Sequence, residues 1–371
     1  MQAQLPLRGD DLQALRADPP RDDSGNLMPW TLGHRLVENM RFDQALEHVG
    51  LTLHDSTFRG FTWSGQSGPI VIRGCVFRDI VFNEVAFTGL RFEDVVFERC
   101  QFDTLQLTEC EFLRCRFVGG ALTLLTSSRC SFTDTRFQEL AGDTWMLRDC
   151  TLTGSSFRGC TLKVPRFSKC TIDRLQVEGG ALHSADFTLV QAAALHIVGA
   201  EVRRLRIVGG ELQAVAFAQV DGNDISLSTA RIGELGFDGC PALIAPHVLD
   251  SNLRVLDIHN CPQVMGLVVQ GCELGRLALR RSTVQYSELV TVRTSGRLVV
   301  EDSALVGFVV RAGAWTEFTL ERSSVAEYIA VDHTRFTAVS TRDLVEAEGL
   351  QYQLDGQPTA GASFWGAIHG A

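Results

Sequence analysis

CVFRDIVFNEVAFTGLRFEDVVF, residues 75–97, has a phenylalanine at every fifth position. A β-strand repeats every two residues, so this spacing would place successive phenylalanines on opposite faces. An α-helix advances about 100° per residue, so five residues rotate each ring by about 140° from the one before. Neither element gathers the rings on one side, and the spacing therefore indicates a different kind of repeat.

The five-residue period continues from Phe77 to Ala242. Of the 34 positions in this series, 15 are Phe and 14 are Leu, Ile or Val. A second column, two residues before each of these positions, is rich in small and apolar residues. It holds nine of the 11 cysteines: Cys75, Cys100, Cys110, Cys115, Cys130, Cys150, Cys160, Cys170 and Cys240. The other three positions of each unit are mostly polar or charged, so the two columns are expected to face a common core.

These units resemble the pentapeptide-repeat family, whose five-residue unit is A(D/N)LXX with the Leu or Phe pointing inward. The units CVFRD, CEFLR, CSFTD and SSFRG follow the pattern, and ADFTL (residues 185–189) matches it in full. Asp or Asn seldom occupies the second position, which is where this sequence departs from the family. The resemblance covers about residues 51–336 and implies an all-β fold, a right-handed quadrilateral parallel β-helix. Four five-residue faces would make one coil of about 20 residues, and residues one coil apart would stack at about 4.8 Å.

Two departures from the five-residue register divide the chain. After Ala242 a longer register survives, in which apolar residues recur at intervals of 21, 21, 21 and 20 residues: Leu235, Leu256, Leu277, Leu298 and Phe318. The segments CPAL (240–243) and CPQV (261–264) therefore predict one-residue insertions at a corner. Upstream, Leu53, Phe58 and Trp63 lie one residue out of register, and GQSGP (65–69) is the predicted loop that resets it. We expect a regular β-helix over 51–242, less regular coils over 243–336, and roughly 14 coils in all.

The ends of the chain predict caps. Residues 1–50 are expected to form an N-terminal cap with short helices, at GDDLQALRAD (9–18) and PWTLGHRLVENM (29–40). Residues 337–371 are expected to form a C-terminal helical cap and tail, with a helix over TRDLVEAEGLQYQL (341–354). The tail GASFWGAIHGA carries three large apolar residues that look exposed, Phe364, Trp365 and Ile368.

The composition excludes several classes of protein. With 44 acidic and 34 basic residues the net charge is −10, which gives no basic excess for holding nucleic acid. No run of 18 apolar residues is present, so we expect no membrane span. The first 20 residues lack the features of a secretory signal, which favours the cytoplasm and leaves open an export route without such a signal. The odd number of cysteines, without a CxxC pair, favours free thiols over a disulfide framework.

No catalytic, cofactor-binding or metal-binding motif is present in the sequence. The nine histidines show no HExxH or other ligand spacing, and the paired glycines at 119–120, 179–180 and 209–210 belong to corners rather than to a phosphate-binding loop. A β-helix filled by its own side chains also offers no internal cavity. We therefore expect no enzyme and no cofactor.

The candidate binding residues are apolar and expected at the surface. Between residues 189 and 218 the outward positions become unusually apolar, and we select Leu189, Val198 and Val208 as partner-binding residues, with Leu189 and Val208 on one face of successive coils. Phe364 and Trp365 in the tail are the second candidate contact, for a docking partner or for a homodimer formed through a terminal cap. The alternative is that the alanine-rich corners are ordinary surface and the tail only caps the last coil.

The expected function is a non-enzymatic protein–protein interaction scaffold or adaptor, with a partner that the sequence does not identify. A more specific version links it to a bacterial secretion system, a context in which pentapeptide-repeat proteins also occur, and a secreted effector is a further alternative. The resemblance also implies a rival function, mimicry of DNA by acidic rods that occupy type II topoisomerases such as gyrase. Against that rival, residues 75–242 carry 21 acidic and 17 basic residues that interleave on every face.

Overall fold

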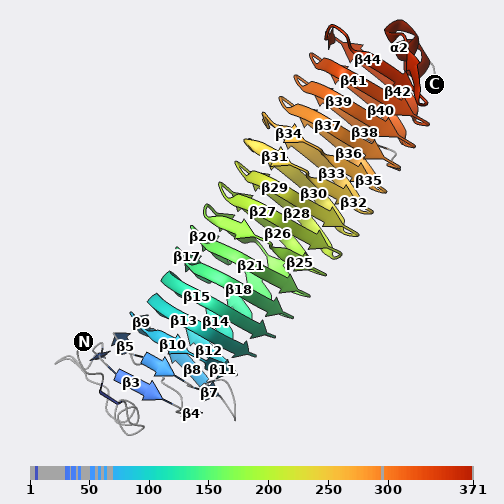
Figure 1. Cartoon of the computed structure of the whole chain (residues 1–371). Coiled ribbons are helices and arrows are strands. Elements are labelled where there is room, and N and C mark those ends of the chain that lie inside the picture. The colour runs from blue at the N-terminus through green and yellow to red at the C-terminus, as the bar shows by residue number, and fades with distance from the viewer. Residues whose placement is uncertain are drawn as a thin grey trace, which may run out of the picture. The chain divides into compact units, whose positions relative to one another are not determined.

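The computed structural model describes residues 70–293 and 296–369, together with short strands of the first 64 residues. The chain divides into two compact units, residues 1–182 and 183–371. Strands make up 71% of the chain and helix 3%, and the strands form a parallel β-solenoid of about 14 turns, as the fold-class prediction expected. Figure 1 shows the strands of successive coils side by side within each unit. Among the described residues, no helix has the length and apolar character needed to span a membrane.

The described strands that begin in residues 1–182 are β1 (Leu5–Pro6), β2 (Trp30–Gly33), β3 (Arg35–Glu38), β4 (Arg41–Phe42), β5 (Leu51–His54), β6 (Thr57–Arg59), β7 (Thr62–Ser64), β8 (Ile70–Arg73), β9 (Val76–Arg78), β10 (Val81–Asn83), β11 (Val85–Thr88), β12 (Leu90–Glu93), β13 (Val96–Thr108), β14 (Glu111–Leu113), β15 (Arg116–Ser128), β16 (Ser131–Thr133), β17 (Arg136–Gln138), β18 (Ala141–Arg148), β19 (Thr151–Thr153), β20 (Ser156–Arg158), β21 (Thr161–Ser168), β22 (Thr171–Asp173), β23 (Leu175–Glu178) and β24 (Ala181–His183).

The remaining elements are β25 (Asp186–Thr188), β26 (Gln191–Val198), β27 (Glu201–Val208), β28 (Glu211–Ala218), β29 (Asp221–Ser228), β30 (Arg231–Asp238), β31 (Ala242–Ile244), β32 (His247–Leu249), β33 (Asn252–His259), β34 (Val264–Met265), β35 (Val268–Gln270), β36 (Glu273–Arg280), β37 (Thr283–Val290), β38 (Arg297–Glu301), β39 (Ala304–Arg311), β40 (Ala314–Glu321), β41 (Ser324–Asp332), β42 (Arg335–Arg342), β43 (Val345–Glu346), β44 (Gln351–Leu354), β45 (Gln357–Thr359) and α2 (Gly361–His369).

The core of the first unit is a set of stacked phenylalanines. Strand pairing is parallel and joins residues 20 apart, so that Phe77 lies beside Phe97 and Phe97 beside Phe117. Their ring centroids are 5.0 and 4.6 Å apart, with planes tilted by only 10° and 12°. Each of these rings is at most 4% exposed. The five-residue spacing is thus explained by four short faces per coil, each of which sends its central side chain to the axis.

The registers confirm where residues are inserted into the coils. Gly222 pairs with Leu243 and Leu243 with Val264, steps of 21 residues, where Val202 and Gly222 are 20 apart. The extra residues therefore fall in the predicted CPAL and CPQV segments. Upstream, Trp63 pairs with Phe87, a step of 24, so the register is reset between Ser64 and Ile70, where the loop was predicted. Residues 65–69 themselves lie outside the described residues.

Both helix predictions that fall on described residues are wrong. Residues 30–33 and 35–38 are strands β2 and β3, which pair in parallel with β5 and β6 and extend the solenoid toward the N-terminus. Over 341–354 the chain continues as the end of β42, then β43 and β44, and the helix α2 follows at 361–369. In both segments pairing with the neighbouring coil outweighs a weak local helix propensity. The helix predicted at 9–18 lies outside the described residues.

Candidate functional site

The cysteine column is part of the core. All 11 cysteines are buried and free. The Cys100 thiol lies 3.2 Å from the carbonyl oxygen of Phe77 on the preceding coil, and burial raises the pKa values of Cys100 and Cys115 to about 12. These two thiols therefore stay protonated at neutral pH, and a protonated thiol is a poor nucleophile and a poor metal ligand. Among the described residues, no three His, Cys, Asp or Glu side chains are grouped as a metal site.

In the second unit, serines take over this column and hydrogen bond along it. The Ser282 hydroxyl accepts from the Cys261 amide at 3.1 Å, and the Ser303 hydroxyl accepts from the Ser282 amide at 3.2 Å. Ser303 in turn donates to the carbonyl oxygen of Glu301 at 2.7 Å. These hydroxyls are buried and engaged with backbone, so they are structural groups rather than candidate nucleophiles.

Charged side chains on the outside form ion pairs between neighbouring coils. Most of these pairs join residues 20 or 21 apart, because such residues lie side by side in the parallel register. They are Arg73–Glu93, Arg78–Glu98, Asp79–Arg99, Arg91–Glu111, Asp94–Arg114, Glu109–Arg129, Asp143–Lys163 and Arg158–Glu178 in the first unit, and Arg204–Asp224, Glu211–Arg231, Glu234–Arg254, Arg280–Glu301, Arg297–Glu317, Asp302–Arg322, Arg311–Asp332 and Glu321–Arg342 in the second. Each bridge neutralises a carboxylate locally.

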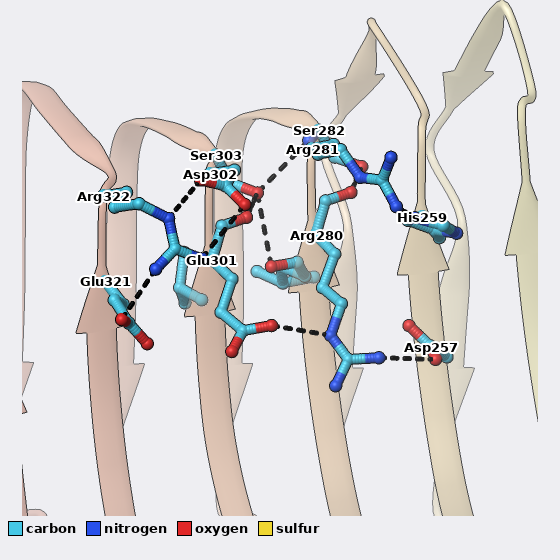
Figure 2. A network of polar contacts seen from close by, with 12 residues as sticks. Asp257, His259, Arg280, Arg281, Ser282, Glu301, Asp302, Ser303, Glu321 and Arg322 are labelled. Atoms are coloured by element: carbon cyan, nitrogen blue, oxygen red, sulfur yellow. Dashed lines mark hydrogen bonds and ion pairs between the residues drawn. The ribbon is translucent and has the colours of Figure 1, made fainter.

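A network of polar contacts lies along one corner of the second unit (Figure 2). There a shallow groove of about 650 Å³ runs over four coils, with Arg281, Asp302, Arg322 and Asp343 in its lining. These four residues occupy equivalent corner positions, with φ between 46° and 51°. The corner therefore presents charges of alternating sign, one on each coil.

Two of the four charged residues in this groove, Asp302 and Arg322, pair with each other. Arg322 donates from Nε and Nη2 to the two carboxylate oxygens of Asp302 at 2.7 and 3.2 Å, and from Nη1 to Glu321 at 2.6 Å. The hydrogen bond from Arg322 holds the pKa of Asp302 below its ordinary value. Arg281 lies 2.7 Å from Nε2 of His259. These contacts fix the orientation of the charged side chains on this part of the surface.

The structure places two of the three residues of the first predicted contact side by side. Leu189 is 53% exposed and sits at a corner with φ of 54°, and its amide donates to the carbonyl oxygen of Val208 at 2.8 Å. Its side chain covers Gly209, whose Cβ would lie 2.9 Å from a Leu189 methyl. Leu189 and Val208 are therefore neighbours on successive coils. Val198 pairs with Ala218, two faces away from Val208 along the coil, so it belongs to a different surface.

The second predicted contact is largely buried. Phe364 is 0% exposed and Ile368 is 3% exposed, which corrects the expectation of an exposed tail. The Phe364 ring lies 5.2 Å from Tyr352 and 5.0 Å from Trp365. Trp365 is half-buried and donates from its indole to Glu346 at 2.8 Å. Helix α2 thus packs on the last strands, and a partner role for Phe364 would require this cap to open.

Sequence analysis missed a further surface feature, two tyrosines that flank a glycine. Tyr286 is 48% exposed, and both it and Tyr328 approach Gly307. The chain contains only three tyrosines, and these two are 42 residues apart, which equals two 21-residue coils. That spacing could have predicted that the two tyrosines lie on the same side of the coils. The repeat itself reveals only the inward-facing columns, and the tyrosines lie outside them at a corner.

Comparison with known proteins identifies the repeat. Residues 90–167 match the family model described as a pentapeptide repeat region. No curated protein sequence matches the chain. Three solved structures resemble it: a trypsin-treated form of QnrB1, a plasmid-mediated fluoroquinolone resistance protein (14% identity, 55% of this chain and 84% of that one, TM-score 0.26); HetL, a pentapeptide repeat protein involved in heterocyst differentiation regulation from the cyanobacterium Nostoc sp. strain PCC 7120 (12%, 83% and 94%, 0.20); and the alginate lyase AlyF-OU02 (8%, 96% and 90%, 0.23). At such identities and TM-scores these similarities carry nothing about function.

Proposed function

Residues 90–167 match the pentapeptide repeat region, and on that premise we propose that the chain acts as a non-enzymatic protein–protein interaction scaffold or adaptor. The coils supply rigid, flat faces whose side chains repeat at the strand spacing of about 4.8 Å. The core is filled by stacked side chains, and in the polar groove of the second unit Arg322 forms ion pairs with Asp302 and Glu321. Binding at the outer surface is the activity that such an arrangement supports best.

The observation that carries this proposal is the neutralisation of carboxylates by arginines one coil away. A protein that imitates duplex DNA must present rows of unpaired negative charge in place of phosphates. Here Asp94 is held by Arg114 at 2.7 Å and Asp302 by Arg322 at 2.7 Å, and the same kind of pair recurs on many coils. A surface of paired charges is a poor match for the DNA-binding site of a topoisomerase. It favours partners that do not require a row of negative charges.

The surface formed by Leu189 and Val208 is the proposed contact for one partner. Leu189 is a large apolar side chain held outward on a corner, at a backbone conformation that costs a Leu roughly 1 kcal/mol. This backbone conformation recurs at many corners, so what distinguishes Leu189 is a large apolar side chain that is 53% exposed, a feature that favours a binding role. The eleven buried free thiols fit a reducing compartment, and we place the chain in the cytoplasm.

Charge substitution at this surface tests the proposal. We expect Leu189→Asp combined with Val208→Glu to leave the β-sheet circular dichroism and melting temperature nearly unchanged and to abolish binding of one protein partner. The partner is identified by affinity purification from the native host and then confirmed with the purified pair by calorimetry. Val345→Asp is the matched control, because Val345 is 64% exposed and lies elsewhere in the same unit.

Two results would contradict the proposal. One is that the purified partner binds the double variant and the wild type equally. The other is that the wild-type protein inhibits supercoiling by a type II topoisomerase at near-equimolar amounts, which would favour the DNA mimic.

A further inference from the structure

The rings of two tyrosines lie against one glycine at a corner of the second unit. Tyr286, Gly307 and Tyr328 lie on three successive coils, and Gly307 has φ of 65°. A Cβ on Gly307 would lie 3.0 Å from Cδ1 of Tyr286 and 3.0 Å from Cε1 of Tyr328. The glycine therefore leaves the room that the rings occupy. We call Tyr286, Gly307, Glu327 and Tyr328 the tyrosine ridge.

An apolar column borders the ridge. Strand register places Ile244, Met265, Gln285, Val306 and Ala326 next to one another on five successive coils. All five side chains are half-buried, and four of them are apolar. Gln285 directly precedes Tyr286, so the column runs alongside the rings. A partner that covers the ridge would also bury part of this column.

Two carboxylates lie at the ridge, Glu327 within it and Glu288 beside it. Glu327 is exposed and accepts a hydrogen bond from the Tyr286 hydroxyl at 2.9 Å. Glu288, two residues after Tyr286, lies on the neighbouring face. Within the described residues, neither carboxylate forms an ion pair with an Arg or Lys, although such pairs are frequent between coils. The ridge therefore combines a tyrosine that is 48% exposed and a half-buried one with carboxylates that have no Arg or Lys partner among the described residues.

This combination is complementary to a cation on an apolar segment. A guanidinium or ammonium group is attracted to the face of a tyrosine ring, and a nearby carboxylate adds a charge-assisted hydrogen bond. We propose that the tyrosine ridge is a docking surface for a protein segment that carries an arginine or lysine flanked by apolar residues. The inference rests on the scaffold function and adds a second contact, separate from Leu189 and Val208, with a stated chemistry.

The hydrogen bond within the ridge can be checked before any ligand is added. Glu327 raises the pKa of Tyr286, because its carboxylate accepts a hydrogen bond from the protonated phenol and its charge disfavours a phenolate nearby. Replacing Glu327 by Gln should lower the Tyr286 pKa, observed as an earlier rise in phenolate absorbance on alkaline titration. An unchanged titration would show that the two side chains are not in contact, and the ridge would lose its carboxylate.

The binding experiment uses a matched pair of peptides on the full chain. One is a fluorescent peptide with an arginine between leucines, and the other replaces arginine by citrulline, which keeps the shape and removes the charge. Fluorescence anisotropy should show the arginine peptide binding about tenfold more tightly, a difference of about 1.4 kcal/mol. Tyr286→Leu and Glu327→Gln should each remove most of that difference. The Tyr286→Leu variant is expected to fold, because Leu189 adopts nearly the same φ at its own corner.

The control is Glu317→Gln, which removes a carboxylate that is already paired with Arg297 at 2.9 Å. It should bind both peptides as the wild type does. Equal binding of the two peptides, or an arginine preference that survives in Tyr286→Leu, would overturn the proposal. Sedimentation that shows the wild-type chain dimerising through the ridge, with loss of the dimer in Tyr286→Leu, would instead assign the surface to a second copy. These results do not depend on the Leu189 variants, so failure here and failure of the scaffold proposal are distinguishable.

Discussion

The corners of the coils depend on single residues with left-handed backbone conformation. Many are not glycine, including Leu189 and Tyr286, while others use a glycine pair such as 209–210. In that pair the second glycine has the more demanding role. A Cβ on Gly210 would lie 2.1 Å from the carbonyl oxygen of Val190, and φ there is 92°. At Gly199 the φ is 62° and no atom lies within 4 Å of a Cβ.

These two glycines provide a matched prediction at the residue scale. Gly199→Ala should cost about 1 kcal/mol of unfolding free energy, the usual price of a left-handed conformation. Gly210→Ala should cost about 3 kcal/mol or more, because the backbone of two coils must move apart to admit a methyl group. Urea denaturation of both variants measures the difference. Equal losses would show that the close approach of the coils at Gly210 is not strictly required.

At the scale of the strand pair, burial decides how much an ion pair between coils contributes. Glu93 is 6% exposed and accepts from Nε of Arg73 and Nε of Arg91, each at 2.6 Å. The hydrogen bond from Arg73 is the main reason that the pKa of Glu93 lies below its ordinary value. Glu109 and Arg129, by contrast, are 58% and 59% exposed. Exposed pairs are weakened by solvent and salt, and buried ones much less so.

We therefore expect Glu93→Gln to destabilise the first unit by about 1.5 to 3 kcal/mol at neutral pH, and Glu109→Gln by less than about 0.5 kcal/mol. The contribution of Glu93 is present above its unfolded-state pKa of about 4.3 and is lost as pH falls through its lower folded-state pKa. The stability difference between wild type and Glu93→Gln should accordingly shrink in acid. Urea midpoints measured from pH 7 down to pH 3 check this, and a difference that stays constant with pH would contradict it.

At the scale of the whole molecule, the sequence predicted the parts of the fold that follow from repetition. Phe77, Phe97 and Phe117 share a column because each is one coil from the next, and the 21-residue steps after residue 240 could be read from the apolar residues alone. The helices at 29–40 and 341–354 were wrong because local apolar spacing was judged without the neighbouring coil, which pairs with those segments as strand.

The surface was less predictable than the core for a related reason. Leu189 and Val208 are 19 residues apart, one residue less than a full coil. The period alone could therefore predict that they lie close together. The burial of Phe364 depends on how the chain folds back after β45, and no repeat encodes that path. The tyrosine ridge depends on a glycine between two rings and on a carboxylate without an arginine partner among the described residues, which are properties of contacts rather than of period.

The cap supplies the prediction at this scale. Phe364→Asp should place a charge in a fully buried site, detach α2 from the last strands and expose their apolar surface. Dye binding and oligomers detected by size-exclusion chromatography should both increase, since an uncovered end of a solenoid invites association. Ala367→Asp, on an exposed position of the same helix, is the control. A monomeric Phe364→Asp protein without dye binding would show that α2 is dispensable.

The parallel register also has a consequence for how such a chain can change in length. Strand partners in most of the described coils are 20 or 21 residues apart, so the strands of each coil pair with the coils directly before and after it. A tandem duplication in the gene that copies one whole coil would therefore add a segment whose neighbours on both sides already match it. A deletion of the same extent would join two coils that fit equally well. Gene duplication and deletion can therefore change the number of coils while the pattern of the core stays the same.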